Sequence, residues 1–195
     1  METNKELIEY LKDTGRIKTE RVEEAFKKVD RKDFIPSEKT KWSYKDQAIR
    51  IGDNSTISAP HMVAINTETL NVKESDEVLE IGSGSGYQLA ILGYLAEKAV
   101  GVEINLELVN KSRERLKDID NVEVIHGNGL SPVENVFDKI LFSAAVESFK
   151  PAIEYVKEDG VILAPIIEGE TQILKKWDSG TVEEISRVRF VEMKE

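Results

Sequence analysis

Residues 78–87 read VLEIGSGSGY, an apolar run that leads into three alternating glycines. The apolar run predicts a short buried strand, and the glycines let the chain turn tightly into a helix expected to begin at Tyr87. A strand, a glycine loop and a helix in this order allow the backbone to approach a nucleotide-like ligand closely. Alone, such a loop is equally compatible with a plain tight turn. The dinucleotide pattern G-x-G-x-x-G would require glycine where the chain has Tyr87, which argues against an NAD-dependent dehydrogenase.

The chain after this loop continues to alternate strands with helices. Short apolar runs predict strands, and amphipathic segments at 87–96 and 106–116 predict helices; the strands are expected at 99–102, 122–125, 140–142 and 161–164. Apolar runs without clean alternation are typical of parallel strands covered on both faces. Two further runs, 171–177 and 188–191, have no helix between them and predict an antiparallel pair. We therefore expect a doubly wound α/β fold whose mostly parallel sheet has a reversed strand near its C-terminal end.

The first 58 residues predict a helical extension of this domain. Apolar residues recur at helical spacing in residues 7–11 and again in 22–29, behind Thr19 as a candidate N-cap. A further helix should begin near Pro60, with Ser58 as its N-cap, and run to about Leu70. We expect a single domain, in which residues 1–58 form the extension and residues 59–195 form the ligand-binding core.

Composition excludes several classes of protein. The chain has 195 residues, of which 40% are hydrophobic and 33% charged, which is a globular mixture. Its 27 basic and 37 acidic side chains give 27 − 37 = −10 at pH 7, which argues against nucleic acid as a partner. It has no cysteine and only two histidines, His61 and His126, so no metal site is expected. No apolar run reaches membrane-spanning length and no signal-peptide core follows Met1, so we expect a cytoplasmic protein.

Two polar residues at the ends of neighbouring strands define the ligand. Glu103 ends the strand at 99–102, where a carboxylate can accept hydrogen bonds from ribose hydroxyls. Asn128 follows the strand at 122–125 and can bond an adenine edge. Neither Lys nor Arg lies in the glycine loop, which suits a cationic sulfonium better than a phosphate. The predicted cofactor is therefore S-adenosyl-L-methionine.

Residues 54–64, NSTISAPHMVA, resemble the signature of the protein-L-isoaspartate O-methyltransferases, as does the stretch 78–87. Similarity to that family extends to GRIKT at 15–19, to DRKDFIP at 30–36, and to VRFV at 188–191, which looks like the family's last strand. The resemblance covers nearly the whole chain. The segment around Ser58 is specific to this family, whereas many methyltransferases share the glycine loop.

The resemblance implies a Rossmann-like methyltransferase that esterifies the free α-carboxylate of L-isoaspartyl residues in damaged proteins, a repair reaction in which the ester collapses to a succinimide. It places a catalytic residue at Ser58, which would hold and aim the substrate carboxylate. It places cofactor contacts at Thr56, Ile57, Ser58, Gly82, Ser83, Gly84, Glu103, Asn128 and Gly129. A carboxylate is already ionised at pH 7, since its unperturbed pKa is about 4, so the reaction needs no general base. His61 is accordingly expected to be structural. The implied partners are proteins or peptides with isoaspartyl residues, and both monomer and dimer remain open.

The chain departs from the family pattern at three places. It has Asn128 where the family has Asp, Asn54-Ser55 where the family has Gly-Gln, and Ile166-Ile167 where a glycine usually follows the strand. Two alternatives stay open: a diverged paralogue that methylates another carboxylate or small acid, and a cofactor-binding module without catalytic activity.

Overall fold

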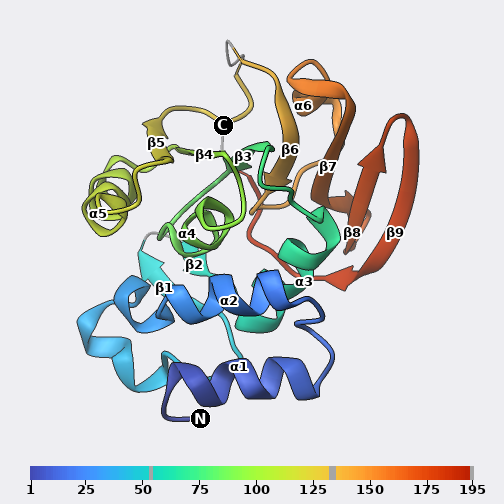
Figure 1. Cartoon of the computed structure of the whole chain (residues 1–195). Coiled ribbons are helices and arrows are strands. Elements are labelled where there is room, and N and C mark those ends of the chain that lie inside the picture. The colour runs from blue at the N-terminus through green and yellow to red at the C-terminus, as the bar shows by residue number, and fades with distance from the viewer. Residues whose placement is uncertain (53–54, 132–134, 194–195) are drawn as a thin grey trace.

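A computed structural model describes residues 1–52, 55–131 and 135–193. In this described part, seven strands form one sheet in the order β5-β4-β3-β6-β7-β8-β9 (Figure 1). The strands are β3 (Glu77–Ile81), β4 (Lys98–Glu103), β5 (Val122–His126), β6 (Phe137–Phe142), β7 (Val156–Glu168), β8 (Thr171–Asp178) and β9 (Thr181–Val188). Strands β3 to β7 pair in parallel, and β8 pairs antiparallel with both β7 and β9. The expected reversed strand is β8.

The helices and a small hairpin complete the fold. The helices are α1 (Asn4–Asp13), α2 (Glu20–Lys28), α3 (Pro60–Leu70), α4 (Tyr87–Gly93), α5 (Leu106–Leu116) and the single turn α6 (Lys150–Ile153), with 3-10 turns η1 (Arg31–Phe34) and η2 (Ser37–Trp42). Strands β1 (Ile49–Gly52) and β2 (Ser55–Ile57) form a separate antiparallel pair. Among the described helices, none is long and apolar enough to cross a membrane.

Alternate residues of the central strands enter two apolar clusters. Val78 and Leu141 belong to the cluster that includes α1 to α5, whereas Leu79 and Phe142 belong to the cluster beneath α6. Because successive side chains of a strand point to opposite faces, the continuous apolar runs seen in the sequence serve both faces of the sheet.

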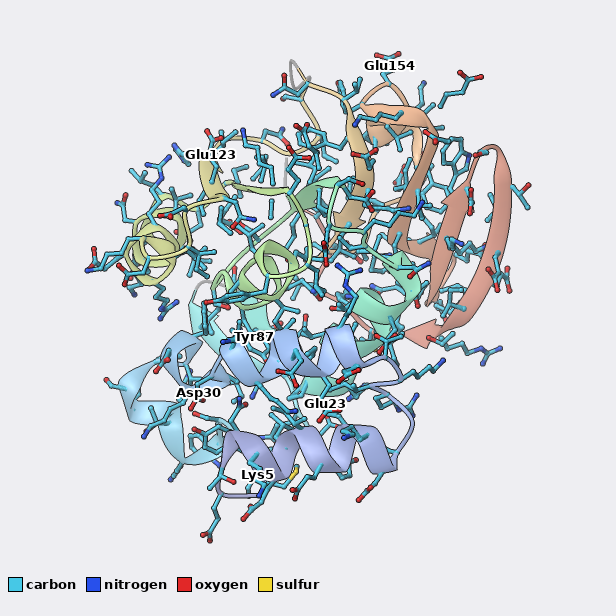
Figure 2. All side chains as sticks on the ribbon, viewed as in Figure 1. Lys5, Glu23, Asp30, Tyr87, Glu123 and Glu154 are labelled. Carbon is cyan, nitrogen blue, oxygen red and sulfur yellow. The ribbon has the colours of Figure 1, made fainter. Side chains whose placement is uncertain are left out.

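The N-terminal helices dock onto the start of α4. Figure 1 shows α1 and α2 side by side below the core, where α2 contacts both α3 and α4. Tyr87, at the start of α4, is 1% exposed and lies close to α2 in Figure 2. The ring of Phe26 meets it edge-on with centroids 6.3 Å apart, and the ring of Phe34 lies at 5.5 Å. The N-terminal extension is therefore packed against α4, the helix that follows the glycine loop.

Three local predictions are wrong in detail. Helix α3 begins at Pro60 as predicted, but its N-cap is Ala59, so Ser58 is not the cap. Helix α4 ends at Gly93 rather than near 96, because the side chain of Asn121 donates to the carbonyls of Gly93, Ala96 and Glu97 at 2.9–3.2 Å.

The last strand also differs from its prediction at 188–191. Strand β9 spans Thr181–Val188, and the chain then leaves the sheet edge. Residues 191–193 run instead beside Ala145, whose amide donates to the carbonyl of Val191 at 2.8 Å and whose carbonyl accepts from the amide of Met193 at 2.8 Å. Of the predicted strand 188–191, only Val188 pairs within the sheet, opposite Gln172, and the Gln172 side chain bonds the backbone of Phe190.

Candidate functional site

The glycine loop lies at the carboxyl end of β3, where the chain turns into α4. Gly82, Gly84 and Gly86 have φ angles of 82°, 53° and 86°, a region that residues with a Cβ rarely adopt. The amides of Gly82 and Ser83 donate to the carbonyl of Val102 on β4 at 2.8 and 3.2 Å. The loop is thus tied to the neighbouring strand, and its shape depends on glycine at three positions.

Glu103 joins the end of β4 to this loop. It is 7% exposed, and its Oε2 accepts a hydrogen bond from the amide of Gly84 at 2.9 Å. Its Oε1 accepts from the amide of Asn105 at 2.8 Å. Because a carboxylate has about four acceptor positions, both oxygens can still accept from hydroxyl groups of a ligand.

Two adjoining hollows open at this end of the sheet, and together we call them the cleft. Ser55, Thr56, Gly82, Gly84, Glu103, Ile104 and Gly129 are among the residues lining the first, and Thr56, Ile57, Ser58, Glu80, Ser83 and Gln88 are among those lining the second. Thr56, Gly82, Gly84 and Ser143 line both. The structure therefore brings the predicted residues of the Thr56–Ser58 segment next to the glycine loop and Glu103.

Asn128 is the predicted site residue that does not line the cleft. Its Oδ1 accepts a hydrogen bond from the amide of Leu130 at 2.9 Å, which closes a turn within its own segment. Gly129 lines the cleft in its place. A Cβ added to Gly129 would lie 2.3 Å from Cγ2 of Ile81, so glycine is required for this segment to lie against the end of β3.

The other two departures from the family pattern have different positions. Asn54 lies outside the described residues, whereas Ser55 begins β2 and lines the cleft. Ile166 and Ile167 lie in β7, where the amide of Ile167 donates to the carbonyl of Val146 at 2.9 Å. These two residues therefore extend a strand and are not among the residues that line the cleft.

The floor of the cleft contains a buried acid. Glu80 is 1% exposed, and its Oε1 accepts a hydrogen bond from the hydroxyl of Ser143 at 2.6 Å. Its Oε2 has no hydrogen-bond partner among the described residues. Burial raises the pKa of Glu80 to about 8, against the smaller opposing effect of the Ser143 hydrogen bond. The raised pKa therefore favours the neutral form of Glu80 at pH 7.

Sequence reasoning missed part of the cleft. Ser143 and Ala144, just after β6, line it, and so do Val191, Glu192 and Met193. Ser143 carries a signal that could have been used, because it follows an apolar strand at the same end of a parallel sheet. The C-terminal residues carry none, because their position depends on the turn of the chain after β9.

The cleft suits a nucleoside-like ligand without phosphates. No lysine or arginine is among the described residues that line it, and Glu103 and Glu192 add acidic groups. Cations that would neutralise a phosphate are therefore missing from the described residues of this lining, whereas hydroxyl groups and a cationic centre fit acidic acceptors. Among all the residues that the structure describes, no group of three or more His, Asp or Glu side chains could hold a metal ion.

Comparison with known proteins agrees with this geometry. The family model described as protein-L-isoaspartate(D-aspartate) O-methyltransferase matches residues 2–195. A protein-L-isoaspartate O-methyltransferase of Dictyoglomus thermophilum is 39% identical, over 97% of this chain and 90% of its own length. One from Fervidobacterium nodosum is 38% identical, over 96% of this chain and 99% of its own length.

A solved structure extends the match to three dimensions. A Plasmodium falciparum protein, described as a protein-L-isoaspartate O-methyltransferase in complex with S-adenosyl-L-homocysteine, superposes with a TM-score of 0.90 at 29% identity. The superposition covers 100% of this chain and 99% of that one. This chain therefore belongs to the protein-L-isoaspartate(D-aspartate) O-methyltransferase family.

Proposed function

We propose that this chain transfers the methyl group of S-adenosyl-L-methionine to the free α-carboxylate of an L-isoaspartyl residue in a damaged protein. Membership of the family and the S-adenosyl-L-homocysteine bound in the Plasmodium falciparum structure support the reaction. The observation that carries the proposal is that Glu103, bonded to Gly84, and Ser58 line adjoining hollows of one cleft.

The cofactor would lie along the end of β3 and β4. When bound, it supplies a methyl group on a sulfonium, the electrophile of the reaction. Glu103 is oriented by two backbone amides, so its remaining acceptor positions can take the ribose hydroxyls. The proposed contacts that line the cleft are Thr56, Ile57, Ser58, Gly82, Ser83, Gly84, Glu103 and Gly129. Asn128 is proposed as a further contact on the family resemblance, through a position of its side chain that the turn to Leu130 does not use.

The protein's contribution to the chemistry is positioning. Methyl transfer to an ionised carboxylate is an in-line displacement and requires no proton to move. Holding two reactants in line can supply roughly 7–11 kcal/mol of such a barrier. We assign Ser58 to the acceptor: its hydroxyl donates a hydrogen bond to the carboxylate and aims one oxygen at the methyl group. Because Ala59 and not Ser58 is the N-cap of α3, the cap role does not compete for this hydroxyl.

The two parts of the chain would then divide the substrates. Residues 1–58 would supply the acceptor side, with the cofactor contacts at 56–58 at its boundary, and residues 59–195 the rest of the cofactor side. The proposal further takes damaged proteins rather than nucleic acid as partners, in line with the net charge of −10, and places the enzyme in the cytoplasm.

The test is methyl transfer from labelled S-adenosyl-L-methionine to an isoaspartyl peptide, beside the matching aspartyl peptide and a Ser58→Ala variant. We expect base-labile label on the isoaspartyl peptide alone, strongly reduced in the variant. Cofactor binding without transfer to either peptide would overturn isoaspartyl specificity and favour another carboxylate or a binding module. Full transfer by Ser58→Ala would overturn the role of Ser58.

A further inference from the structure

A buried guanidinium lies directly behind the Ser58 segment. Arg31, in the turn η1, is 0% exposed. Its Nη1 donates to the carbonyl of Ser43 at 2.6 Å, and its Nη2 donates to the carbonyls of Gln47 and Ser58, both at 3.0 Å. One side chain from the N-terminal extension therefore holds the backbone at both residues 43–47 and Ser58.

The charge on this side chain has no ion-pair partner among the described residues, but burial, which lowers the pKa of Arg31, is partly opposed by Tyr87 and by the carboxylate of Asp46. Among the described residues, no carboxylate forms an ion pair with Arg31, and its buried Nε has no hydrogen-bond partner. Burial lowers the pKa of Arg31 to about 10, so the group stays charged at neutral pH. The ring of Tyr87 lies 5.9 Å from the guanidinium carbon and supplies a weak neutral contact. A buried cation without an ion pair is costly, so its hydrogen bonds to three backbone carbonyls are needed to hold it here.

A second side chain, that of Asp46, holds the far end of the turn that runs from Ser58 to His61. The carboxylate of Asp46 accepts a hydrogen bond from the amide of His61 at 2.9 Å and lies 2.8 Å from the Nδ1 of its ring. Asp46 belongs to the 43–47 segment that Arg31 holds. The turn from Ser58 to His61 is therefore fastened at its first residue by Arg31 and at its last by Asp46.

We propose that Arg31 is a positioning residue for the methyl acceptor: it fixes the Ser58 backbone and keeps a positive charge behind the acceptor carboxylate. The inference rests on the proposed function, because it takes Ser58 as the residue that holds that carboxylate. A guanidinium suits this role, since its planar fork can hold several carbonyls in a fixed geometry while remaining charged.

The alternative is that Arg31 only stabilises the fold, and a matched control separates the two roles. Arg21, in α2, makes the same kind of contact, because its guanidinium donates to the carbonyls of Val72 and Leu95 at 2.8 and 3.0 Å. Neither carbonyl belongs to a residue that lines the cleft. Arg21→Met should therefore lower thermal stability without changing the kinetic constants.

The experiment compares Arg31→Met, Arg31→Lys and Arg21→Met with the wild type, using an isoaspartyl peptide and S-adenosyl-L-methionine. Rates are expressed per site that binds S-adenosyl-L-homocysteine, so that unfolded protein does not count. For Arg31→Met we expect a higher peptide KM and a kcat lower by about 10- to 100-fold, the effect of a misplacement of about 1 Å. Arg31→Lys keeps the charge but loses the fork, so it should recover KM more than kcat. Affinity for S-adenosyl-L-homocysteine should stay at the wild-type value in Arg21→Met, and in the Arg31 variants it should change less than the peptide KM, because Ser58 is only one of the proposed cofactor contacts.

Wild-type KM and kcat in the Arg31 variants, with an active wild type, would overturn the inference and leave the proposed function intact. A wild type that does not methylate the isoaspartyl peptide would overturn the proposed function, and the inference with it. If Arg31→Met does not fold, Arg31→Lys carries the test, because it loses the fork that holds the carbonyls of Gln47 and Ser58. A lower kcat per binding site in Arg31→Lys would support the inference, and wild-type kcat and KM would overturn it.

Discussion

The hydroxyl of Ser143 donates a hydrogen bond to the buried carboxyl group of Glu80 at 2.6 Å, which joins the ends of β6 and β3 beneath the glycine loop. Burial, and more weakly the charge of Glu103, raise the pKa of Glu80 to about 8. The folded protein therefore holds a proton on Glu80 over a pH range in which the unfolded chain has lost it.

This difference predicts a pH-dependent stability. As pH rises from about 4.5, the usual pKa of a glutamate in an unfolded chain, to about 8, its pKa in the folded protein, the free energy of unfolding should fall, by no more than about 1.4 kcal/mol per pH unit for one proton. Above that range both states are ionised, and the contribution is constant. Glu80→Gln keeps an acceptor for Ser143 and removes the titration. Urea unfolding curves can be measured at intervals of about one pH unit from about pH 5 to about pH 9. With rising pH, the wild type should lose stability relative to the variant. Parallel curves would contradict the assignment.

A second prediction concerns the two glycines that flank Asn128. A Cβ on Gly129 would lie 2.3 Å from Cγ2 of Ile81, whereas one on Gly127 would have its nearest neighbour, Cγ1 of Val102, at 3.9 Å. Gly129→Ala should therefore lower the free energy of unfolding by about 1–3 kcal/mol, as overpacking does, and should weaken binding of S-adenosyl-L-homocysteine. Gly127→Ala is the matched control and should change little. Denaturant unfolding and calorimetric titration test both, and equal effects of the two variants would be the contrary result.

A third prediction concerns Glu103. In Glu103→Gln one carboxylate oxygen becomes an NH2 group, which faces the amide of either Gly84 or Asn105, so two donors oppose each other. Hydrogen bonds to a charged group are worth about 1.5–3 kcal/mol, so affinity for S-adenosyl-L-homocysteine should fall by about 10- to 100-fold. Glu123→Gln, on β5, removes an exposed ion pair with Lys98 and should bind normally. Calorimetric titration measures both, and an unaltered affinity in Glu103→Gln would remove Glu103 from the cofactor site.

A fourth prediction addresses the departure at Asn128. The carboxamide oxygen already closes the turn to Leu130, and an aspartate would keep that bond while adding a charge. Asn128→Asp should therefore preserve the fold and bind S-adenosyl-L-homocysteine more tightly, by up to about tenfold, because charge-assisted hydrogen bonds are stronger than neutral ones. Weaker binding in this variant would show that the amide itself is required.

Much of the fold and part of the site follow from local sequence. The positions of the central strands, the glycine loop after β3 and the acid at the end of β4 could be predicted, because apolar runs and glycines act within a few residues of chain. Glu103 could be predicted as a site residue because parallel strands end at one edge of the sheet.

Other features depended on contacts between distant segments. The end of α4 is decided by Asn121, and the path of residues 191–193 by hydrogen bonds to Ala145. The resemblance assigned Asn128 to the cofactor, but whether its side chain would face the cleft or its own turn could not be read from spacing.

The sequence by itself determined the class of fold, the reversed strand near the C-terminal end and the nature of the ligand, because these depend on periodicity, on glycine and on the kinds of acceptor at strand ends. Only the tertiary structure decided which groups complete the cleft and how Ser58 is held. Arg31 and Ser58 are 27 residues apart, and Glu80 and Ser143 are 63 apart. Such pairs form only when the whole sheet and its N-terminal extension are packed, since burial and long-range contacts have no local sequence signal.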